Sequence, residues 1–287
     1  MIDQNLKILV TGAGGQLGQE IKSLSEVYNR PNWSFADSKA LDITDERQVK
    51  DYIGAYTPEV IINCAAYTAV DAAESDPNGA FAVNVSGIQN LTAYAGKALI
   101  IHISTDFVFD GNSFVAYKET DETHPIGAYG KTKMEGEKLL QHITDNHIII
   151  RTSWLYGSFG KNFMKTMLHL ADSRSELSVV ADQVGTPTYT GDLALAIIRI
   201  LEQDQVERGI YHFSNEGVAS WYDFAHAIFD MAGKNIKLIP IKSEAYPTPA
   251  KRPHFSVLDK TKIKKAIHME IPHWRDSLEV ALKKHLR

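Results

Sequence analysis

The chain has 287 residues, a net charge of −5, an apolar share of 44% and a charged share of 23%. That length supports one large or two modest domains with a real core, and the composition is ordinary for a soluble globular protein. The negative charge argues against a nucleic-acid partner, and the locally basic stretch Lys260–Lys265 is interpreted as a solvated helix face. The one cysteine, Cys64, cannot form an intrachain disulfide, so the fold does not depend on an oxidising compartment.

The chain shows no targeting or membrane signal. The polar stretch Asp3-Gln4-Asn5 comes before any apolar run, which is unlike a signal peptide. No apolar stretch approaches the ~20 residues that a membrane helix needs. We therefore expect a cytoplasmic protein with no membrane partner.

The first half alternates short apolar runs with longer amphipathic runs. The apolar runs predict buried strands at Leu6–Val10, Trp33–Ala36, Val60–Asn63, Leu99–Ile103 and His147–Ile150. The amphipathic runs predict helices at Leu17–Val27, Asp45–Tyr56, Pro77–Gly96 and Ala128–Gln141. This alternation predicts an α/β fold with a doubly wound parallel sheet of the Rossmann type.

The second half is less regular. Its patterns predict helices at Asn162–Ala171 and Asp192–Leu201, strands at Leu177–Val180 and Ile210–Phe213, a helix opened by a capping box at Ser220–Asp223, and an extended loop at Pro240–Pro253. We expect a dinucleotide-binding domain over residues 1–155 and a smaller C-terminal substrate-binding lobe over residues 156–287. Segments at about 190–230 could return to the main sheet.

A glycine-rich loop lies between the first predicted strand and the first predicted helix, with Gly12, Gly15 and Gly18 evenly spaced. In that setting Gly12 permits a tight turn, Gly15 lets the backbone approach a pyrophosphate, and Gly18 lets the helix pack on the strand. The alternative, a turn with no ligand, is disfavoured by the strand-to-helix setting. The Gly-x-x-Gly-x-x-Gly spacing is typical of short-chain dehydrogenase/reductases.

Asp37 follows the second predicted strand, where a residue that contacts the adenosine ribose is expected. Its carboxylate would accept hydrogen bonds from a 2′-hydroxyl and repel a 2′-phosphate, which favours NADH. Lys39 weakens that preference, so NADH and NADPH both stay open. Asp42 is a second candidate near the adenine, and its alternative role is that of a helix N-terminal acid.

Tyr129 and Lys133 are four residues apart on a predicted helix and so share one face. We expect the ammonium to lower the pKa of Tyr129, so that the phenol can exchange a proton near neutral pH. Such pairs are common on helix surfaces, but Thr105 lies 24 residues earlier at the end of a predicted strand. Ser104 is adjacent to Thr105, and because neighbouring strand residues face opposite ways, we favour Thr105 as the third residue.

Other polar residues carry weaker signals. In Asn63-Cys64-Ala65-Ala66, small side chains would let a cofactor lie against the backbone, and Cys64 is interpreted as small and buried rather than nucleophilic. His102 is interpreted as a core histidine. Asp71 and Glu74, near a predicted helix start, are interpreted as acids that cap the helix or compensate its dipole. No cysteine cluster or His-Glu-x-x-His motif indicates catalytic zinc.

Taken together, these residues resemble the extended short-chain dehydrogenase/reductases over nearly the whole chain. Within that superfamily they resemble the reductases of the last step of dTDP-L-rhamnose synthesis. The motifs that carry this resemblance are Asn63 to Asp71, Ser104 to Phe109, Arg151 to Gly157, Asp182 to Thr188 and Tyr246 to Pro253.

The resemblance implies roles for individual residues. Catalysis would rest on Thr105, Tyr129 and Lys133. The substrate would contact Thr105, Asp106, Tyr129, Trp154 and Arg252, the last as a diphosphate ligand unless it is simply a surface arginine. The cofactor would be lined by Gly12, Gly15, Gln16, Leu17, Gly18, Asp37, Asp42, Ile43, Cys64, Ala65, Ala66, Tyr129 and Lys133.

The implied reaction is the reduction by NADH or NADPH of the C4 keto group of dTDP-4-dehydro-L-rhamnose, with Tyr129 as proton donor. One alternative is another nucleotide-sugar reductase, epimerase or dehydratase, although Asp106 is followed by Phe107 rather than by the second carboxylate of a dehydratase. Another is a non-catalytic, cofactor-binding regulatory subunit. Some members of the family bind Mg²⁺ at a homodimer interface, but Gly191 occupies a position where a carboxylate ligand is expected, so no metal ligand is assigned.

Overall fold

The computed structural model describes residues 5–27, 32–203 and 205–285. Asp3 and Gln4 of the polar N-terminal stretch lie outside these ranges. The centre of the molecule is a six-stranded sheet in the order β10-β5-β4-β3-β1-β2, and every pairing in it is parallel. Its strands are β1 (Ile8–Thr11), β2 (Trp33–Ala36), β3 (Val60–Asn63), β4 (Leu99–Thr105), β5 (His147–Thr152) and β10 (Gly209–His212). The predicted doubly wound parallel sheet is therefore confirmed.

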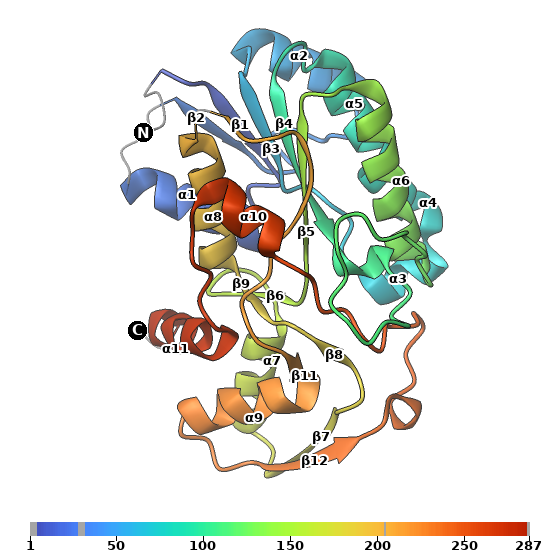
Figure 1. Cartoon of the computed structure of the whole chain (residues 1–287), viewed down its shortest axis with the longest axis vertical. Coiled ribbons are helices and arrows are strands. Elements are labelled where there is room, and N and C mark those ends of the chain that lie inside the picture. The colour runs from blue at the N-terminus through green and yellow to red at the C-terminus, as the bar shows by residue number, and fades with distance from the viewer. Residues whose placement is uncertain (1–4, 28–31, 204, 286–287) are drawn as a thin grey trace.

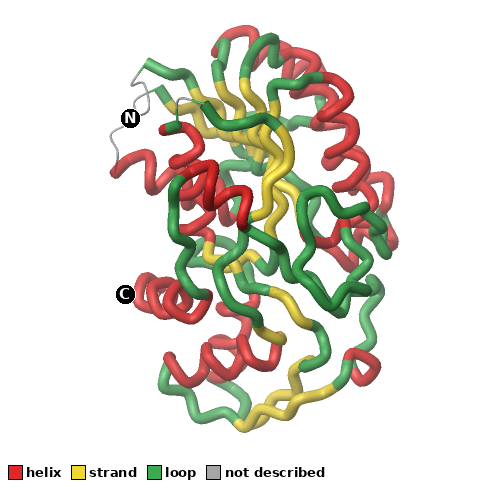
Figure 2. The backbone as a smooth tube through the Cα atoms, in the orientation of Figure 1, coloured by secondary structure: helices red, strands yellow, loops and turns green. Residues whose placement is uncertain are grey.

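Helices cover both faces of this sheet (Figures 1 and 2). One face carries α1 (Gln16–Val27), α8 (Thr190–Glu202) and α10 (Thr261–Ile267), and the other carries α2 (Glu46–Tyr56), α5 (Gly87–Tyr94) and α6 (Ala128–Ile143). Because successive strand residues point to opposite faces, Ile8 and Val10 pack in the first cluster and Leu9 in the second. Two buried faces explain why the strand sequences are apolar throughout rather than alternating.

The predicted helix Pro77–Gly96 is interrupted. After α3 (Val70–Ser75), the chain forms α4 (Pro77–Phe81), a π-helical turn (Ala82–Ser86) and then α5. Within the wide turn, the Asn84 amide bonds both the backbone nitrogen and the carbonyl of Tyr67. A Cβ at Gly136 of α6 would collide with the Asn84 carbonyl. Hydrophobic periodicity shows one helical face, but it does not report such a tertiary contact.

The C-terminal elements gather below the sheet in Figure 1 around a second hydrophobic cluster. They include α7 (Phe163–Ala171), α9 (Trp221–Met231), α11 (Trp274–His285) and the parallel pair β7 (Glu176–Val180) and β12 (Lys237–Ile241). Two further pairs are β6 (Leu155–Tyr156) with β9 (Thr188–Tyr189), and β8 (Val184–Gly185) with β11 (Ala219–Ser220). The predicted capping box at Ser220 is confirmed. Strand β12 was not expected, because Pro240 within it lacks the N–H that a ladder uses.

The sheet places several loops at one edge. Because β1 pairs with both β2 and β3, the strand order reverses there, and ligands bind at the carboxyl edge of such a sheet. The loops that carry Gly12, Cys64 and Asp106 all leave this edge, after β1, β3 and β4. Among the described residues, no helix is both long and apolar enough to cross a membrane.

Candidate active site

The glycine loop is built from close backbone contacts. Gly12 has φ +64°, and a Cβ there would lie 2.5 Å from the backbone nitrogen of Ala65. A Cβ at Gly18 would lie 2.6 Å from the Gly12 carbonyl oxygen, so α1 packs against the loop only because Gly18 has no side chain. The Gly15 nitrogen donates to the Gly12 carbonyl at 2.9 Å. These contacts hold the turn at the N-terminus of α1, where backbone N–H groups favour phosphate.

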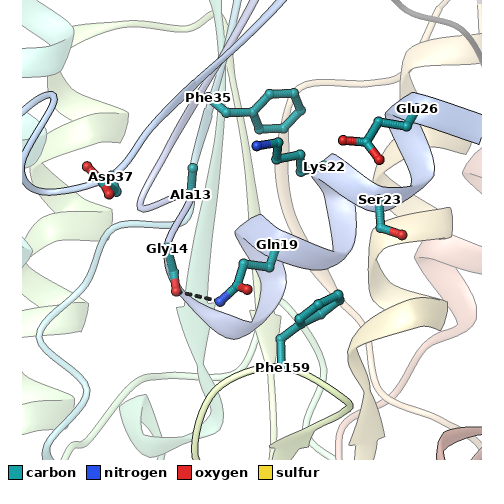
Figure 3. Close-up of a pocket in the computed structure, with 9 residues that line it drawn as sticks. All are labelled: Ala13, Gly14, Gln19, Lys22, Ser23, Glu26, Phe35, Asp37 and Phe159. Carbon is teal, nitrogen blue, oxygen red and sulfur yellow. Dashed lines mark hydrogen bonds between the residues drawn. The ribbon is translucent and has the colours of Figure 1, made fainter. Parts of the chain in front are cut away.

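A pocket of about 550 Å³ lies beside this loop (Figure 3). Its lining consists of Ala13, Gly14, Gln19, Lys22, Ser23, Glu26, Phe35, Asp37 and Phe159. One oxygen of Asp37 accepts hydrogen bonds from the backbone nitrogens of Lys39 and Ala40, both at 3.0 Å. The accepting oxygen of Asp37 is Oδ1 in both hydrogen bonds. The glycine turn, the helix N-terminus and this pocket fit the adenosine and diphosphate of a dinucleotide.

Other predicted cofactor residues have structural partners. Leu17 is buried in the sheet core, so its side chain faces away from the loop. Asp42 accepts hydrogen bonds from the backbone nitrogen and the hydroxyl of Thr44, at 2.9 and 2.8 Å, while Asp45 caps α2. Ile43 is buried, and a Cβ at Gly87 would collide with it. Asp42 and Ile43 thus shape the loop after β2.

Gln16 is held by the C-terminal half of the chain. Its Oε1 accepts a hydrogen bond from Asn162 Nδ2 at 3.0 Å, although 146 residues separate the two. A Cβ at Gly160 would lie 2.7 Å from the Gln16 side chain, and Phe159 reaches the pocket in Figure 3. No local sequence pattern indicates that the loop of residues 159–162 packs against the glycine turn.

Tyr129 lies buried at the start of α6 beside the end of β4. Its ring makes an edge contact with Phe107 at 5.6 Å between centroids, and a Cβ at Gly130 would collide with the Phe107 carbonyl. Burial raises the pKa of Tyr129 to about 12, a hydrogen bond with Thr105 opposes this rise, and the Asp106 charge adds to it. The expectation that Lys133 lowers this pKa is wrong for this structure. Lys133 Nζ instead donates a hydrogen bond to the Ile103 carbonyl oxygen at 2.7 Å.

Thr105 and Ser104 face opposite ways at the end of β4, as neighbouring strand residues do. The Thr105 hydroxyl donates to Asp106 Oδ1 at 3.1 Å and accepts from the Phe107 nitrogen at 3.2 Å. Ser104 donates to Glu137 at 2.5 Å, on the far side of the strand. Thr105 is thus the hydroxyl beside Tyr129.

Ser256, which no motif indicated, lies near both Asp106 and Trp154. Burial raises the pKa of Asp106 to about 6, partly opposed by hydrogen bonds with Ser256 and Thr105. A Cβ at Gly185 would lie 2.8 Å from both the Ser256 hydroxyl and the Trp154 ring. Trp154 has φ +46°, a backbone strain that often marks functional positions, and it stacks on Trp221 with ring centroids 3.6 Å apart.

Arg252 forms a bidentate ion pair with Asp71, with contacts of 2.7 and 3.1 Å. Asp71 does not cap α3, which has no side-chain cap, but it lies in the first turn of that helix, where a negative charge suits the helix dipole. Glu74 instead accepts from the backbone nitrogen of Ala128 at 2.8 Å, at the start of α6. Both acids therefore connect α3 to segments far along the chain, and Arg252 is a partly exposed side chain held by Asp71.

Cys64 is half-buried beside the glycine loop, and the buried Lys133 lies close enough for the two charges to interact. Burial raises the pKa of Cys64 to about 12, which agrees with an inert thiol. Burial lowers the pKa of Lys133 to about 8, against the raising effects of Glu137 and Cys64. Among the residues that the structure describes, no group of three or more His, Cys, Asp or Glu side chains is arranged to hold a metal ion.

Comparison with known proteins identifies the family. A family model described as the RmlD substrate binding domain matches residues 6–287. The chain belongs to this family. A dTDP-4-dehydrorhamnose reductase of Aggregatibacter actinomycetemcomitans is 47% identical over 285 residues, which cover 95% of this chain and 97% of that protein.

Solved structures agree with this assignment. A dTDP-4-dehydrorhamnose reductase from Clostridium acetobutylicum is 41% identical, with a TM-score of 0.94 over 98% of this chain and 100% of the other. The enzyme of that name from Bacillus anthracis, solved in complex with NADP, is 36% identical, with a TM-score of 0.93 over 98% of this chain and 99% of the other. Both relatives span the sheet and the C-terminal elements together.

Proposed function

We propose that this chain reduces the C4 keto group of dTDP-4-dehydro-L-rhamnose to give dTDP-L-rhamnose, using NADH or NADPH. The observation that carries the proposal is the group formed by Thr105, Asp106 and Tyr129 at the carboxyl end of β4, beside a glycine turn suited to a dinucleotide. The names of the relatives, including the one solved with NADP, support the same reaction.

Tyr129 is suited to give a proton rather than to take one. A phenol whose pKa is about 12 is protonated at neutral pH, and an alkoxide formed from a carbonyl is a stronger base, so transfer to it is favourable. Thr105, whose interaction with Tyr129 lowers the pKa of the phenol, would orient it. The dinucleotide, when bound, supplies the hydride.

The substrate would lie between the end of β4 and the C-terminal elements. Asp106, whose pKa is raised to about 6, would bind sugar hydroxyls, and Trp154 would cover the ring. Arg252 would exchange the Asp71 carboxylate for diphosphate oxygens, which match its planar fork in the same way. We accordingly propose residues 1–155 as the dinucleotide-binding domain and residues 156–287 as the substrate-binding lobe, with β10 added to the main sheet.

The test is to mix the purified protein with dTDP-4-dehydro-L-rhamnose and follow the loss of NADH or NADPH absorbance, with and without EDTA. Magnetic resonance then identifies the sugar. We expect dTDP-L-rhamnose in amounts equal to the nicotinamide oxidised. Faster turnover of a different nucleotide sugar, or cofactor binding without turnover together with a stable larger partner, would reject the proposal. Size-exclusion chromatography of the same sample tests whether the chain forms the homodimer that the resemblance leaves open, and the cytoplasmic location stays a prediction.

A further inference from the structure

One face of α1 carries two side chains that are held by segments far along the chain. Gln16 and Glu20 are four residues apart and so lie one above the other on this helix. Gln16 Oε1 accepts a hydrogen bond from Asn162 Nδ2 at 3.0 Å. Glu20 Oε1 accepts one from Lys284 Nζ at 2.6 Å, across 264 residues of sequence. The helix whose N-terminus suits phosphate is therefore tied to two separate parts of the C-terminal half.

Glu20 is a charged side chain in a buried position, and Lys284 is its counterion. The Glu20 side chain is 3% exposed, whereas that of Lys284 is 40% exposed. Among the residues that the structure describes, Lys284 carries the only cation within 4 Å of the Glu20 carboxylate, and none donates a hydrogen bond to Glu20 Oε2. Because a buried carboxylate without a partner is strongly destabilising, the burial of Glu20 requires the Lys284 ammonium at this position.

The same ammonium lies against the wall of the pocket in Figure 3. Lys284 Nζ is 5.4 Å from the centre of the Phe159 ring, within the range of a cation–π contact. Phe159 lines the pocket, and its carbonyl oxygen accepts a hydrogen bond from Asn162 Nδ2 at 3.4 Å. Lys284 thus joins α1, through Glu20, to an aromatic side chain of the pocket wall.

Helix α11 brings Lys284 to this position. Trp274 and Leu278 of α11 are buried in the second hydrophobic cluster, so the apolar face of the helix fixes its place. Lys284 lies in the last turn, where a positive charge also suits the helix dipole. Its neighbour Lys283 is exposed and pairs with Glu279 of the same helix at 2.5 Å. Two adjacent lysines therefore differ in what they hold, and only the second contacts α1.

We propose that Lys284 is a positioning residue for the dinucleotide, which holds α1 and Phe159 together and so shapes the pocket before the cofactor binds. This role rests on the dinucleotide-dependent function proposed above. A pocket wall that is already in place does not have to be ordered on binding, and the affinity is higher by the entropy that is saved. The last helix of the chain thus contributes to cofactor affinity rather than to the chemical step.

The test is a fluorescence titration of NADPH into the full-length protein. Lys284→Met keeps the length of the side chain but removes its charge, so we expect the dissociation constant of NADPH to rise about fivefold. Saturating NADPH should restore kcat, and KM for the nucleotide sugar should stay within about twofold. Lys284→Arg keeps a cation and should retain the affinity. Lys283→Met is the matched control, because it removes the same charge one residue away, and it should leave all of these values unchanged.

A double variant separates positioning from stability. Lys284→Met leaves Glu20 buried without a counterion, so its Tm should fall. Adding Glu20→Gln removes that unpaired charge and should recover most of the Tm, while the NADPH affinity stays weak because Phe159 still lacks its cation. Recovery of the affinity together with the Tm would overturn the proposal, and so would an unchanged affinity in Lys284→Met.

Phe159→Leu tests the route through the pocket wall. If Lys284 acts on the cofactor through the ring, the effects of Lys284→Met and Phe159→Leu on NADPH affinity should be less than additive. Additive effects would contradict that route. None of these titrations needs the sugar, so weakened NADPH binding by Lys284→Met in a protein that lacks reductase activity would reject the proposed function alone.

Discussion

The carboxyl edge of the sheet and the C-terminal loops hold their functional side chains by different means. At the sheet edge, Thr105 and Tyr129 sit on regular elements, and their positions follow from strand alternation and helix periodicity. In the C-terminal loops, Trp154 and Arg252 are held by residues distant in sequence, such as Trp221 and Asp71. We infer that the sheet edge determines the chemistry and that the loops determine which carbonyl compound reaches it.

The largest effect expected from this division is at Tyr129. Tyr129→Phe keeps the ring contact with Phe107 but removes the proton donor, so kcat should fall by roughly 10²–10⁴-fold. NADPH affinity, measured by fluorescence titration, should change little. Loss of affinity in step with kcat would show that the phenol acts through the fold rather than through proton transfer.

Gly12→Ala tests whether the sheet edge depends on close backbone contact. The new Cβ would lie 2.5 Å from the Ala65 nitrogen, so we expect NADPH affinity to fall at least about tenfold and Tm to drop by roughly 4 °C or more. Gly96→Ala is the control, because Gly96 has φ +60° with nothing within 4 Å of a Cβ. Equal NADPH affinity in the two variants would show that close backbone contact at Gly12 is not needed for cofactor binding.

The extent to which sequence alone predicted this molecule follows the same division. The strands Trp33–Ala36 and Val60–Asn63 were predicted to the residue, because buried parallel strands have a local apolar signature. The π-helical turn at Asn84, strand β12 and the Asp71–Arg252 pair were not predicted, since each arises from contacts between distant segments. For the same reason, the spacing of Tyr129 and Lys133 did not show that Lys133 Nζ lies 3.2 Å from His102 Nε2.

Asp106 lies where the two regions meet, and its charge makes stability depend on pH. Its folded pKa of about 6 exceeds the ordinary value of 3.8, so burying the charged form destabilises the protein above pH 6 and this penalty disappears as the pH falls below 4. Asp106→Asn lacks the penalty. Urea unfolding should show the advantage of the variant over the unaltered protein shrinking by roughly 1.5 kcal/mol between pH 8 and pH 5. A pH-independent difference would mean that Asp106 is charged at no cost.

The smallest stability effect is expected in the loops. The Asp71–Arg252 pair is partly exposed, so Asp71→Asn should cost at most about 1 kcal/mol of unfolding free energy. Because it frees the guanidinium, it should leave KM for the nucleotide sugar unchanged or lower. Arg252→Ala should raise KM about tenfold by removing a charge-assisted phosphate contact. If both variants raised KM equally, Arg252 would serve only to hold the loop.

The most direct test of the whole account is a crystal structure with oxidised NADP and dTDP-L-rhamnose bound together. We expect the C4 hydroxyl of the sugar within about 2.6–3.2 Å of the Tyr129 hydroxyl, with Asp106 and Trp154 against the same ring and the dinucleotide on the glycine turn. A sugar ring bound away from Tyr129, or a nicotinamide on the far side of the sheet edge, would contradict it.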